Sequence, residues 1–322
     1  MLRPQVLHVQ ELIRLRRARR QRAQRSLALR VLSALGLGLG VVSMLAAVVA
    51  LAAAPLYDYI SEDLPPVQQL AILLDPEQGQ LREPTRFLDR EGNLLFVLAP
   101  EGFEERSFIA PGESPLLAAA VVASLDADFY LHSGLQLSDP AATEGLAEKL
   151  VADLLAADRA STSANRVRVR LLAAQALEEY GHEQILAWVL NSANFGKGAI
   201  GAASAAQLYF GKAADQLSLA EAAMLAGVIE APALNPIDAF ELAQRRQQAV
   251  LLAMLDQGLI NQQAATEALV EELVIRPDLG LALGAAPEFA RLAIRQAEAL
   301  LGKTRLERGG LSIQTSLDGD LQ

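Results

Sequence analysis

The sequence predicts a mainly α-helical protein with one small β-hairpin, attached to a single N-terminal transmembrane helix. Three observations support this prediction. The stretch Ile185–Gly227 alternates apolar, small-residue helical segments with glycines that permit tight turns. Two short apolar runs flank Gly92–Asn93, a sequence typical of a turn between strands. No charged residue occurs from Val31 to Tyr57, and about 20 apolar residues suffice to cross a hydrocarbon core.

Composition and charge exclude several kinds of function. The chain has 322 residues, a net charge of −10 and no cysteine. An acidic protein is poorly suited to bind nucleic acid, because such binding requires a basic surface that neutralises phosphate. The lack of cysteine excludes disulfides and cysteine-ligated zinc. The three histidines (His8, His132 and His182) are scattered along the sequence, so we expect neither a metal site nor a cofactor.

The N-terminal segment has the pattern of a membrane anchor. Residues 1–30 contain nine arginines and a single acidic residue, Glu11, and they immediately precede the uncharged span 31–57. Arginines before a span favour an N-terminus in the cytoplasm and a body on the other side of the membrane. A cleaved signal peptide is the alternative, but this span is longer than a typical signal-peptide core. Gly36 and Gly40 form a Gly-x-x-x-Gly pair, which lets two helices approach closely.

The remainder divides into a connector and a helical body. In the connector, residues 58–115, the expected strands of the hairpin are Phe87–Leu88 and Leu94–Val97. In the body, glycines end helices, while Ser218 with Glu221 forms a capping box and Asn261 is an N-cap. The expected helices are Leu116–Leu125, Arg166–Tyr180 ended by Gly181, Glu183–Leu190, Ala202–Tyr209 ended by Gly211, one that begins after Ser218, and one from Asn261 through Leu273.

The stretch Ile185–Gly227 also carries the most specific motif in the chain. Its key residues are Leu190–Asn191, Phe195–Gly196, Gly198, Gly201, Ala205–Ala206, Tyr209–Lys212, Leu217, Glu221–Ala223 and Leu225–Gly227. This spacing resembles the L-N-x-x-x-F-G-x-G-x-x-G, A-A-x-x-Y-F-G-K and L-x-x-x-E-A-A-x-L-A-G motifs of the family-51 peptidoglycan glycosyltransferases, which polymerise lipid II outside the bacterial membrane. The resemblance implies a lysozyme-like glycosyltransferase domain over residues 116–275.

The motif that supplies this family's first catalytic glutamate is altered. In the sequence S-L-D-A-D-F-Y-L-H-S-G, Asp126, Phe129, His132 and Gly134 fall on the family pattern Glu-Asp-x-x-Phe-x-x-His-x-Gly, while Leu125 occupies the glutamate position. The family uses that glutamate as the general base that deprotonates the acceptor sugar, and leucine cannot accept a proton. Asp126 and Asp128 are the nearby carboxylates, but neighbouring helical side chains point about 100° apart.

The second glutamate position and the cations that face the donor substrate are altered as well. The alignment places Arg170, or Val169 in a register shifted by one, at the second glutamate. It places Ala152 and Val167 at two lysines of the family. The first of these lysines would contact the diphosphate of the polyprenyl-linked sugar, and alanine offers neither charge nor donor.

Five residues remain candidates for substrate binding by resemblance: His132, Arg159, Arg166, Asn191 and Lys197. Arg166 alternates with Arg168 and Arg170. These three arginines either bind a diphosphate or are solvated on a helix, and the solvated alternative is favoured. For His132, a structural hydrogen-bonded role is favoured over a catalytic one.

The C-terminal segment, residues 276–322, resembles an inter-domain linker. Its sequence R-G-G-L-S-I-Q-T-S-L-D-G-D-L-Q is similar to the segment of class A penicillin-binding proteins that leads into a transpeptidase domain, and the chain contains no Ser-x-x-Lys nucleophile motif. We therefore expect a linker toward a transpeptidase-like domain that is not present in this chain. Its strand-like residues Leu311–Leu317 are expected to lack stable partners.

The altered motifs favour one of three functional hypotheses. The first is a membrane-anchored, inactive scaffold or lipid II-binding pseudoenzyme in cell-wall biogenesis. The second is an active lipid II polymerase with relocated acids, and the third is a lysozyme-like lytic enzyme. The nearby acids are Asp126, Asp128, Glu144 and Glu148. The expected partners are the bilayer, lipid II or nascent glycan, and cell-wall synthesis proteins, and the expected location is the bacterial cytoplasmic (inner) membrane.

Overall fold

The computed structural model describes residues 36–48, 51, 64–99, 106–133, 145–156, 162–277, 283 and 286–318. The chain divides into two compact units, Met1–Asp63 and Leu64–Gln322. In the first unit, residues 36–48 are helical and exposed. The predicted anchor, 31–57, extends beyond these described residues on both sides. No helix among the described residues has both the length and the apolar character needed to cross a membrane.

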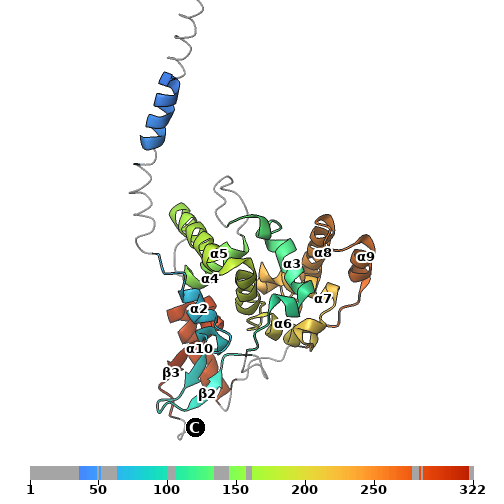
Figure 1. Cartoon of the computed structure of the whole chain (residues 1–322). Coiled ribbons are helices and arrows are strands. Elements are labelled where there is room, and N and C mark those ends of the chain that lie inside the picture. The colour runs from blue at the N-terminus through green and yellow to red at the C-terminus, as the bar shows by residue number, and fades with distance from the viewer. Residues whose placement is uncertain are drawn as a thin grey trace, which may run out of the picture. The chain divides into compact units, whose positions relative to one another are not determined.

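The second unit is mainly helical with one small sheet (Figure 1). Its helices are α2 (Gln69–Leu74), α3 (Pro115–Leu125), α4 (Leu146–Leu155), α5 (Ser163–Ser192), α6 (Ala202–Phe210), α7 (Leu219–Ile229), α8 (Phe240–Asp256), α9 (Gln262–Val270), α10 (Pro287–Leu301) and α11 (Lys303–Arg308). Its strands are β1 (Arg86–Leu88), β2 (Leu94–Val97) and β3 (Ser312–Gln314). The expectation of a mainly α protein with a small hairpin is confirmed.

The main hydrophobic core is built around α7. Ten of its residues, Ala220 through Ile229, are buried. Their small side chains let α3 and α8 pack closely against α7, and Figure 1 shows these helices side by side. The one charged residue of α7, Glu221, lies at its N-terminus, where its carboxylate accepts the Ser218 N–H at 2.8 Å. A helix that is buried on all faces tolerates a carboxylate only where hydrogen bonds satisfy it.

The predicted helix boundaries are largely confirmed. Gly181 has φ 74° and interrupts α5, so its two halves correspond to the two helices expected there. Gly211 ends α6 in the left-handed conformation, with φ 69°. Asn261 accepts the Ala264 N–H at 2.8 Å and caps α9. The expected end of that helix at Leu273 is wrong: α9 stops at Val270, and Leu273 packs against the main core from an extended segment.

The small sheet has strand order β2-β1-β3. Strands β1 and β2 form the predicted antiparallel hairpin, and the Phe87 and Phe96 rings stack at 4.5 Å. Asp89 supplies the turn by accepting the N–H groups of Glu91 and Asn93, each at 2.8 Å. The two phenylalanines join α10 and α11 in a second, smaller core, to which Ala290, Ala293, Ala297 and Leu306 also contribute.

The expectation that Leu311–Leu317 lack stable partners is wrong. Strand β3 pairs in parallel with β1, with Ile313 opposite Phe87. The pairing continues beyond the strand, since the Thr315 N–H donates to the Leu88 carbonyl at 2.9 Å and the Arg90 N–H donates to the Leu317 carbonyl at 2.9 Å. The C-terminal segment therefore completes the sheet that the connector begins.

Candidate functional site

The loop Asn194–Gly201 joins α5 to α6 and carries the centre of the specific motif. Its bends rely on Gly196, Gly198 and Gly201, which all have positive φ. Lys197, between the first two, has φ 54° and is the one non-glycine residue with positive φ in the described part of the chain. Its Nζ lies 2.7 Å from Asp238 Oδ1, an ion pair that ties the loop to the segment before α8.

Other motif residues make buried structural hydrogen bonds. Asn191, a predicted substrate-binding residue, is 7% exposed. Its amide donates to the Ile109 and Ala187 carbonyls, each at 2.7 Å, and its Oδ1 accepts the Ile109 N–H at 2.8 Å. The Tyr209 hydroxyl donates to the Phe195 carbonyl at 2.6 Å. Thus the amide of Asn191 and the hydroxyl of Tyr209 fasten one part of the backbone to another.

The two positions aligned with the family's first catalytic motif lie where α3 ends. Leu125 is the last residue of α3, is half-buried and packs against the main core. The next residue, Asp126, has a side chain that is 7% exposed, and both of its oxygens are bound. His132 Nε2 lies 2.9 Å from its Oδ1, and the Leu146 N–H at the start of α4 donates to its Oδ2 at 3.0 Å. A Cβ on Gly145 would lie 2.6 Å from the same Oδ2, so a larger residue there would require the Asp126 carboxylate to shift.

His132 belongs to a cluster that holds the short turn Phe129–Leu131 against the second half of α5. His182 Nε2 lies 3.0 Å from the His132 carbonyl, and the Phe129 and His182 rings meet edge to face at 5.0 Å. The Tyr130 hydroxyl donates to Glu183 at 3.2 Å, and burial together with the Glu183 charge raises the pKa of Tyr130. His132 therefore contacts Asp126 with its ring and His182 with its carbonyl.

The two candidates for the second glutamate position differ in environment. Val169 is buried in the main core, with 6% exposure. Arg170 Nε lies 3.4 Å from Glu148 Oε1 on α4, and these side chains are 13% and 11% exposed. The pair joins α4 to α5, two helices in extensive contact. Sequence analysis singled out Arg170 and Glu148 separately, but it did not predict that their side chains are in contact.

The remaining candidates lie at the surface or outside the described residues. Asp128 and Arg166 are exposed, and Arg168 is half-buried. Val167, at a lysine position of the family, is 36% exposed. Arg159 and Glu144 fall on residues that the structure does not describe. Among the described residues, no group of three or more histidine, aspartate and glutamate side chains is arranged to hold a metal ion.

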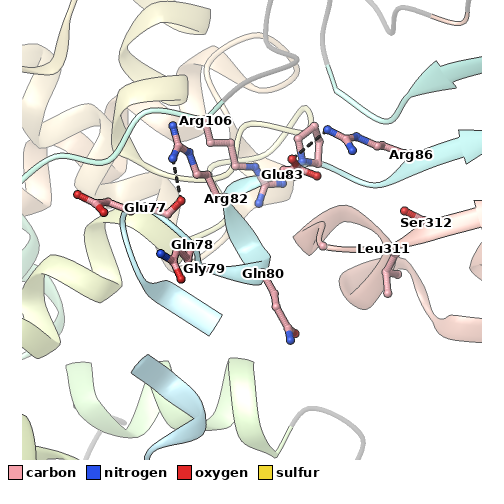
Figure 2. A pocket seen from close by; sticks show the side chains of 12 residues that line it. Glu77, Gln78, Gly79, Gln80, Arg82, Glu83, Arg86, Arg106, Leu311 and Ser312 are labelled. Atoms are coloured by element: carbon pink, nitrogen blue, oxygen red, sulfur yellow. Dashed lines mark hydrogen bonds and ion pairs between the residues drawn. The ribbon is translucent and has the colours of Figure 1, made fainter. Parts of the chain in front are cut away.

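A polar pocket lies away from these motifs, where the start of the sheet meets the C-terminal segment (Figure 2). It has a volume of about 480 Å³ and is lined by Arg82, Arg86, Arg106, Glu77, Glu83 and Ser312 among others. Arg86 lies 3.0 Å from Glu83, and Arg82 donates to the Glu77 carbonyl at 3.0 Å. Sequence reasoning missed this pocket, because its walls are separated by more than 200 residues along the chain.

These groups differ in what they can do chemically. A general base needs a carboxylate oxygen that reaches the substrate proton. Leu125 offers none, Asp126 is held by His132 and by the first N–H of α4, and Glu148 faces a guanidinium. Two carboxylates of the motif region, Asp126 and Glu148, are thus bound to protein groups.

Comparison with known proteins identifies where the similarity lies. Residues 103–255 match the family described as transglycosylase. Penicillin-binding protein 1A from Rickettsia bellii is 30% identical over 286 residues, which are 82% of this chain and 35% of that protein. Penicillin-binding protein 2D from Bacillus subtilis is 36% identical over 149 residues, covering 45% of this chain and 22% of that protein. The chain thus spans about a third or less of these relatives.

A solved structure is similar as well. The crystal structure of penicillin-binding protein 1A from Haemophilus influenzae aligns with 70% of this chain and 25% of that chain, at 20% identity and a TM-score of 0.38. The family match over residues 103–255 covers the positions Leu125 and Arg170 and the whole stretch Ile185–Gly227.

Proposed function

We propose that this chain serves cell-wall synthesis without polymerising glycan, because residues 103–255 match the transglycosylase family and penicillin-binding protein 1A is similar over most of the chain. It acts as a scaffold, or as a module that binds lipid II. The domain is lysozyme-like, sits outside the cytoplasm and is held at the membrane by residues 31–57.

The contrast between retained and altered residues supports this proposal. Asn191, Tyr209 and Glu221 match the family motif, and each makes hydrogen bonds that hold the fold together. The altered positions are those to which the family assigns chemistry: in the proposed alignment Leu125 stands at the first glutamate, and Arg170, or Val169 in the shifted register, at the second. Retention of the hydrogen-bonding motif residues maintains the fold. Replacement of the glutamates and lysines of the family removes the proton acceptor and the positive charges that face the donor substrate.

The observation that carries the proposal is the pairing of Arg170 with Glu148. An arginine at an acidic position reverses the local charge, and a carboxylate on the facing helix lies 3.4 Å from it. General-base catalysis contributes about 10²–10⁴-fold to rate, and support of a departing anion is usually larger. Without either effect, polymerisation falls below detection.

An active polymerase is the second candidate, and Glu148 is the observation that favours it. Glu148, one of the acids considered for that role, lies beside Arg170. In this alternative Glu148 replaces the family's carboxylate, while Arg170 stabilises the diphosphate that leaves.

The proposed organisation follows the predicted boundaries. Residues 1–30 are a cytoplasmic basic segment, 31–57 the anchor, 58–115 the connector and 116–275 the transglycosylase-like domain. Residues 276–322 lead toward a further domain and also supply β3 to the connector sheet. A reporter fused after Gln322 is expected to be active outside the cytoplasm only, and cytoplasmic activity would contradict the proposed topology.

The enzymatic test uses the purified, detergent-solubilised chain and lipid II, with glycan length read on a gel. We expect no polymer above the control without protein. Polymer above that control would overturn the proposal, and its loss in Glu148→Gln but not in Asp128→Asn would then support the alternative. Binding of lipid II by the same preparation, measured by microscale thermophoresis, separates a lipid II-binding module from a scaffold that works through protein partners.

A further inference from the structure

Arg106 fastens the C-terminal segment to the start of the small sheet. Its guanidinium donates to the carbonyls of Leu81, Glu307 and Arg308, with the Leu81 bond at 2.8 Å and the Glu307 bond at 3.2 Å. Burial lowers the pKa of Arg106 to about 10, so the group is still charged at neutral pH. Figure 2 shows Arg106 where the η1 turn (Gln80–Arg82) meets the C-terminal segment. One buried cation therefore joins two segments separated by more than 200 residues.

The contacts next to Arg106 extend this attachment into β3. The Thr85 hydroxyl donates to the Leu306 carbonyl at 2.7 Å, and the Gly310 N–H donates to the Glu83 carbonyl at 2.7 Å. The Arg86 N–H then donates to the Leu311 carbonyl at 2.8 Å, where β1 and β3 begin to pair. From Leu306 to β3 the backbone is thus bound continuously to the segment before β1.

Glu307 connects the same segment to the loop Asn194–Gly201 in the helical part of the molecule. Its backbone carbonyl is bound by Arg106, while its side-chain Oε2 accepts the Asn194 amide at 3.3 Å. Asn194 in turn shapes the loop, because its Oδ1 accepts the Gly196 N–H at 2.8 Å. Glu307 is therefore bound on one side by the sheet attachment and on the other by the glycine-rich loop.

The Glu307 side chain is half-buried, at 23% exposure, and lies between charges of both signs. Lys303 Nζ lies 3.6 Å from its Oε1, and Glu298 on α10 adds a repulsive charge. The Arg106 guanidinium binds its backbone carbonyl. Burial raises the pKa of Glu307, while Lys303 and the Asn194 hydrogen bond partly offset that effect.

We propose that Glu307 couples the order of β3 to the order of the loop Asn194–Gly201, so that a change in the C-terminal strand alters the loop. Helix α11, which carries Glu307, has only six residues, and Arg106 binds the carbonyls of its last two. A displacement of β3 shifts α11 through Arg106 and pulls on the Asn194 amide. This coupling is independent of whether the domain polymerises glycan.

The test measures amide hydrogen exchange of the full chain in detergent. Thr315→Pro removes the N–H that donates to Leu88, and so weakens the β1–β3 attachment. The readout is the exchange of Phe195, Ala199 and Gly201, whose N–H groups bond within or at the base of the loop. We expect their exchange to rise about fivefold, the factor that corresponds to one net hydrogen bond. Thr315→Ser is the matched control and should change neither region.

Substitution of Glu307 tests whether the effect passes through that residue. In a Glu307→Ala background the loop amides exchange faster from the outset, and Thr315→Pro adds no further increase. In a Glu307→Gln background an acceptor for Asn194 remains, so the coupling persists. Three results would each overturn the proposal. Thr315→Pro could accelerate exchange in β1 alone, or accelerate the loop amides as much in the Glu307→Ala background as in the original protein. It could also accelerate exchange equally across α7, which would indicate global destabilisation.

Discussion

Arg170 on α5 and Glu148 on α4 form a largely buried ion pair, with Arg170 Nε 3.4 Å from Glu148 Oε1. Each charge has lost most of its hydration, so each depends on the other for compensation. The pair includes a residue, Arg170, that is proposed to stand at the second glutamate position of the family. Its first consequence concerns stability, because a buried charge without its partner is costly.

Removal of the Glu148 charge is expected to destabilise the protein. Glu148→Gln leaves the Arg170 guanidinium facing an uncharged amide in a site where both side chains are nearly buried. The expected loss in free energy of unfolding is about 3 kcal/mol, at the low end of what breaking a buried pair costs, since some solvent reaches both groups. Chemical denaturation followed by circular dichroism measures this loss.

The double variant Glu148→Leu with Arg170→Met is the matched control. It removes both charges and keeps similar volume, so it should be closer to the original protein in stability than Glu148→Gln is. A double variant that loses more stability than the single one would contradict a purely electrostatic pairing of these two residues.

A second prediction concerns Asp126. Because its carboxylate binds His132 and the first N–H of α4, Asp126→Ala should cost about 1–2 kcal/mol, the range measured for loss of a helix-capping acceptor. Asp128→Ala is the control, since Asp128 is exposed two residues away. Urea denaturation of both variants gives the comparison, and equal stability of the two would show that Asp126 does not secure α4.

Local features of the fold could be predicted from the sequence, whereas contacts between distant segments could not. The Ser218–Glu221 capping box and the Asp89 turn depend on residues a few positions apart, so their patterns identify them. Strand β3 has a short and partly polar sequence, and its parallel partner lies more than 200 residues earlier. Resemblance to a linker therefore predicted too little order for it.

In the candidate site, too, local sequence features could be predicted, whereas contacts between helices could not. Alignment with the family motifs predicts that Leu125, and either Arg170 or Val169, stand at the two glutamate positions, and that step needs only the order of residues. It did not show that Asp126 binds His132 and α4, or that Glu148 faces Arg170, since both depend on how α3, α4 and α5 are packed. Charge complementarity between Glu148 and Arg170 was present in the sequence, but no local spacing connected the two.

A third prediction concerns Arg106. Arg106→Met keeps the apolar stem but leaves the carbonyls of Leu81, Glu307 and Arg308 without the buried donor they share. Unsatisfied buried groups cost about 1–3 kcal/mol each when no water replaces the donor, so we expect a loss of about 3 kcal/mol overall. Thermal unfolding checks the value. Arg82→Met, at an exposed position in the same pocket, should shift the melting temperature far less.

A fourth prediction concerns backbone strain at Lys197. With φ 54°, this residue occupies a region that costs a non-glycine residue about 1 kcal/mol or more. Lys197→Gly and Lys197→Ala both remove the ion pair with Asp238, so their difference isolates the backbone. The glycine variant should be the more stable of the two by about 1 kcal/mol in chemical denaturation. Greater stability of the alanine variant would mean that strain at this position is relieved elsewhere.

The last prediction is a pH dependence that arises from Glu307. Burial raises the pKa of its carboxyl above the ordinary value of 4.5, so the folded protein holds this proton more tightly than the unfolded chain does. At a pH between 4.5 and the raised pKa of the folded protein, the unfolded chain has released the Glu307 proton, whereas the folded protein retains it. The contribution of Glu307 to stability therefore falls as the pH rises through that window, and it is most favourable below 4.5.

Glu307→Gln removes this titration and keeps an acceptor for the Asn194 amide. The stability of the variant relative to the original protein should therefore increase from about pH 4 to about pH 7, whatever the other carboxylates do, because they titrate in both proteins. Urea denaturation at several pH values measures the difference directly. A difference that stays constant over this range would mean that Glu307 is as well solvated in the folded protein as in the unfolded chain, and that the contact with Asn194 is not buried in solution.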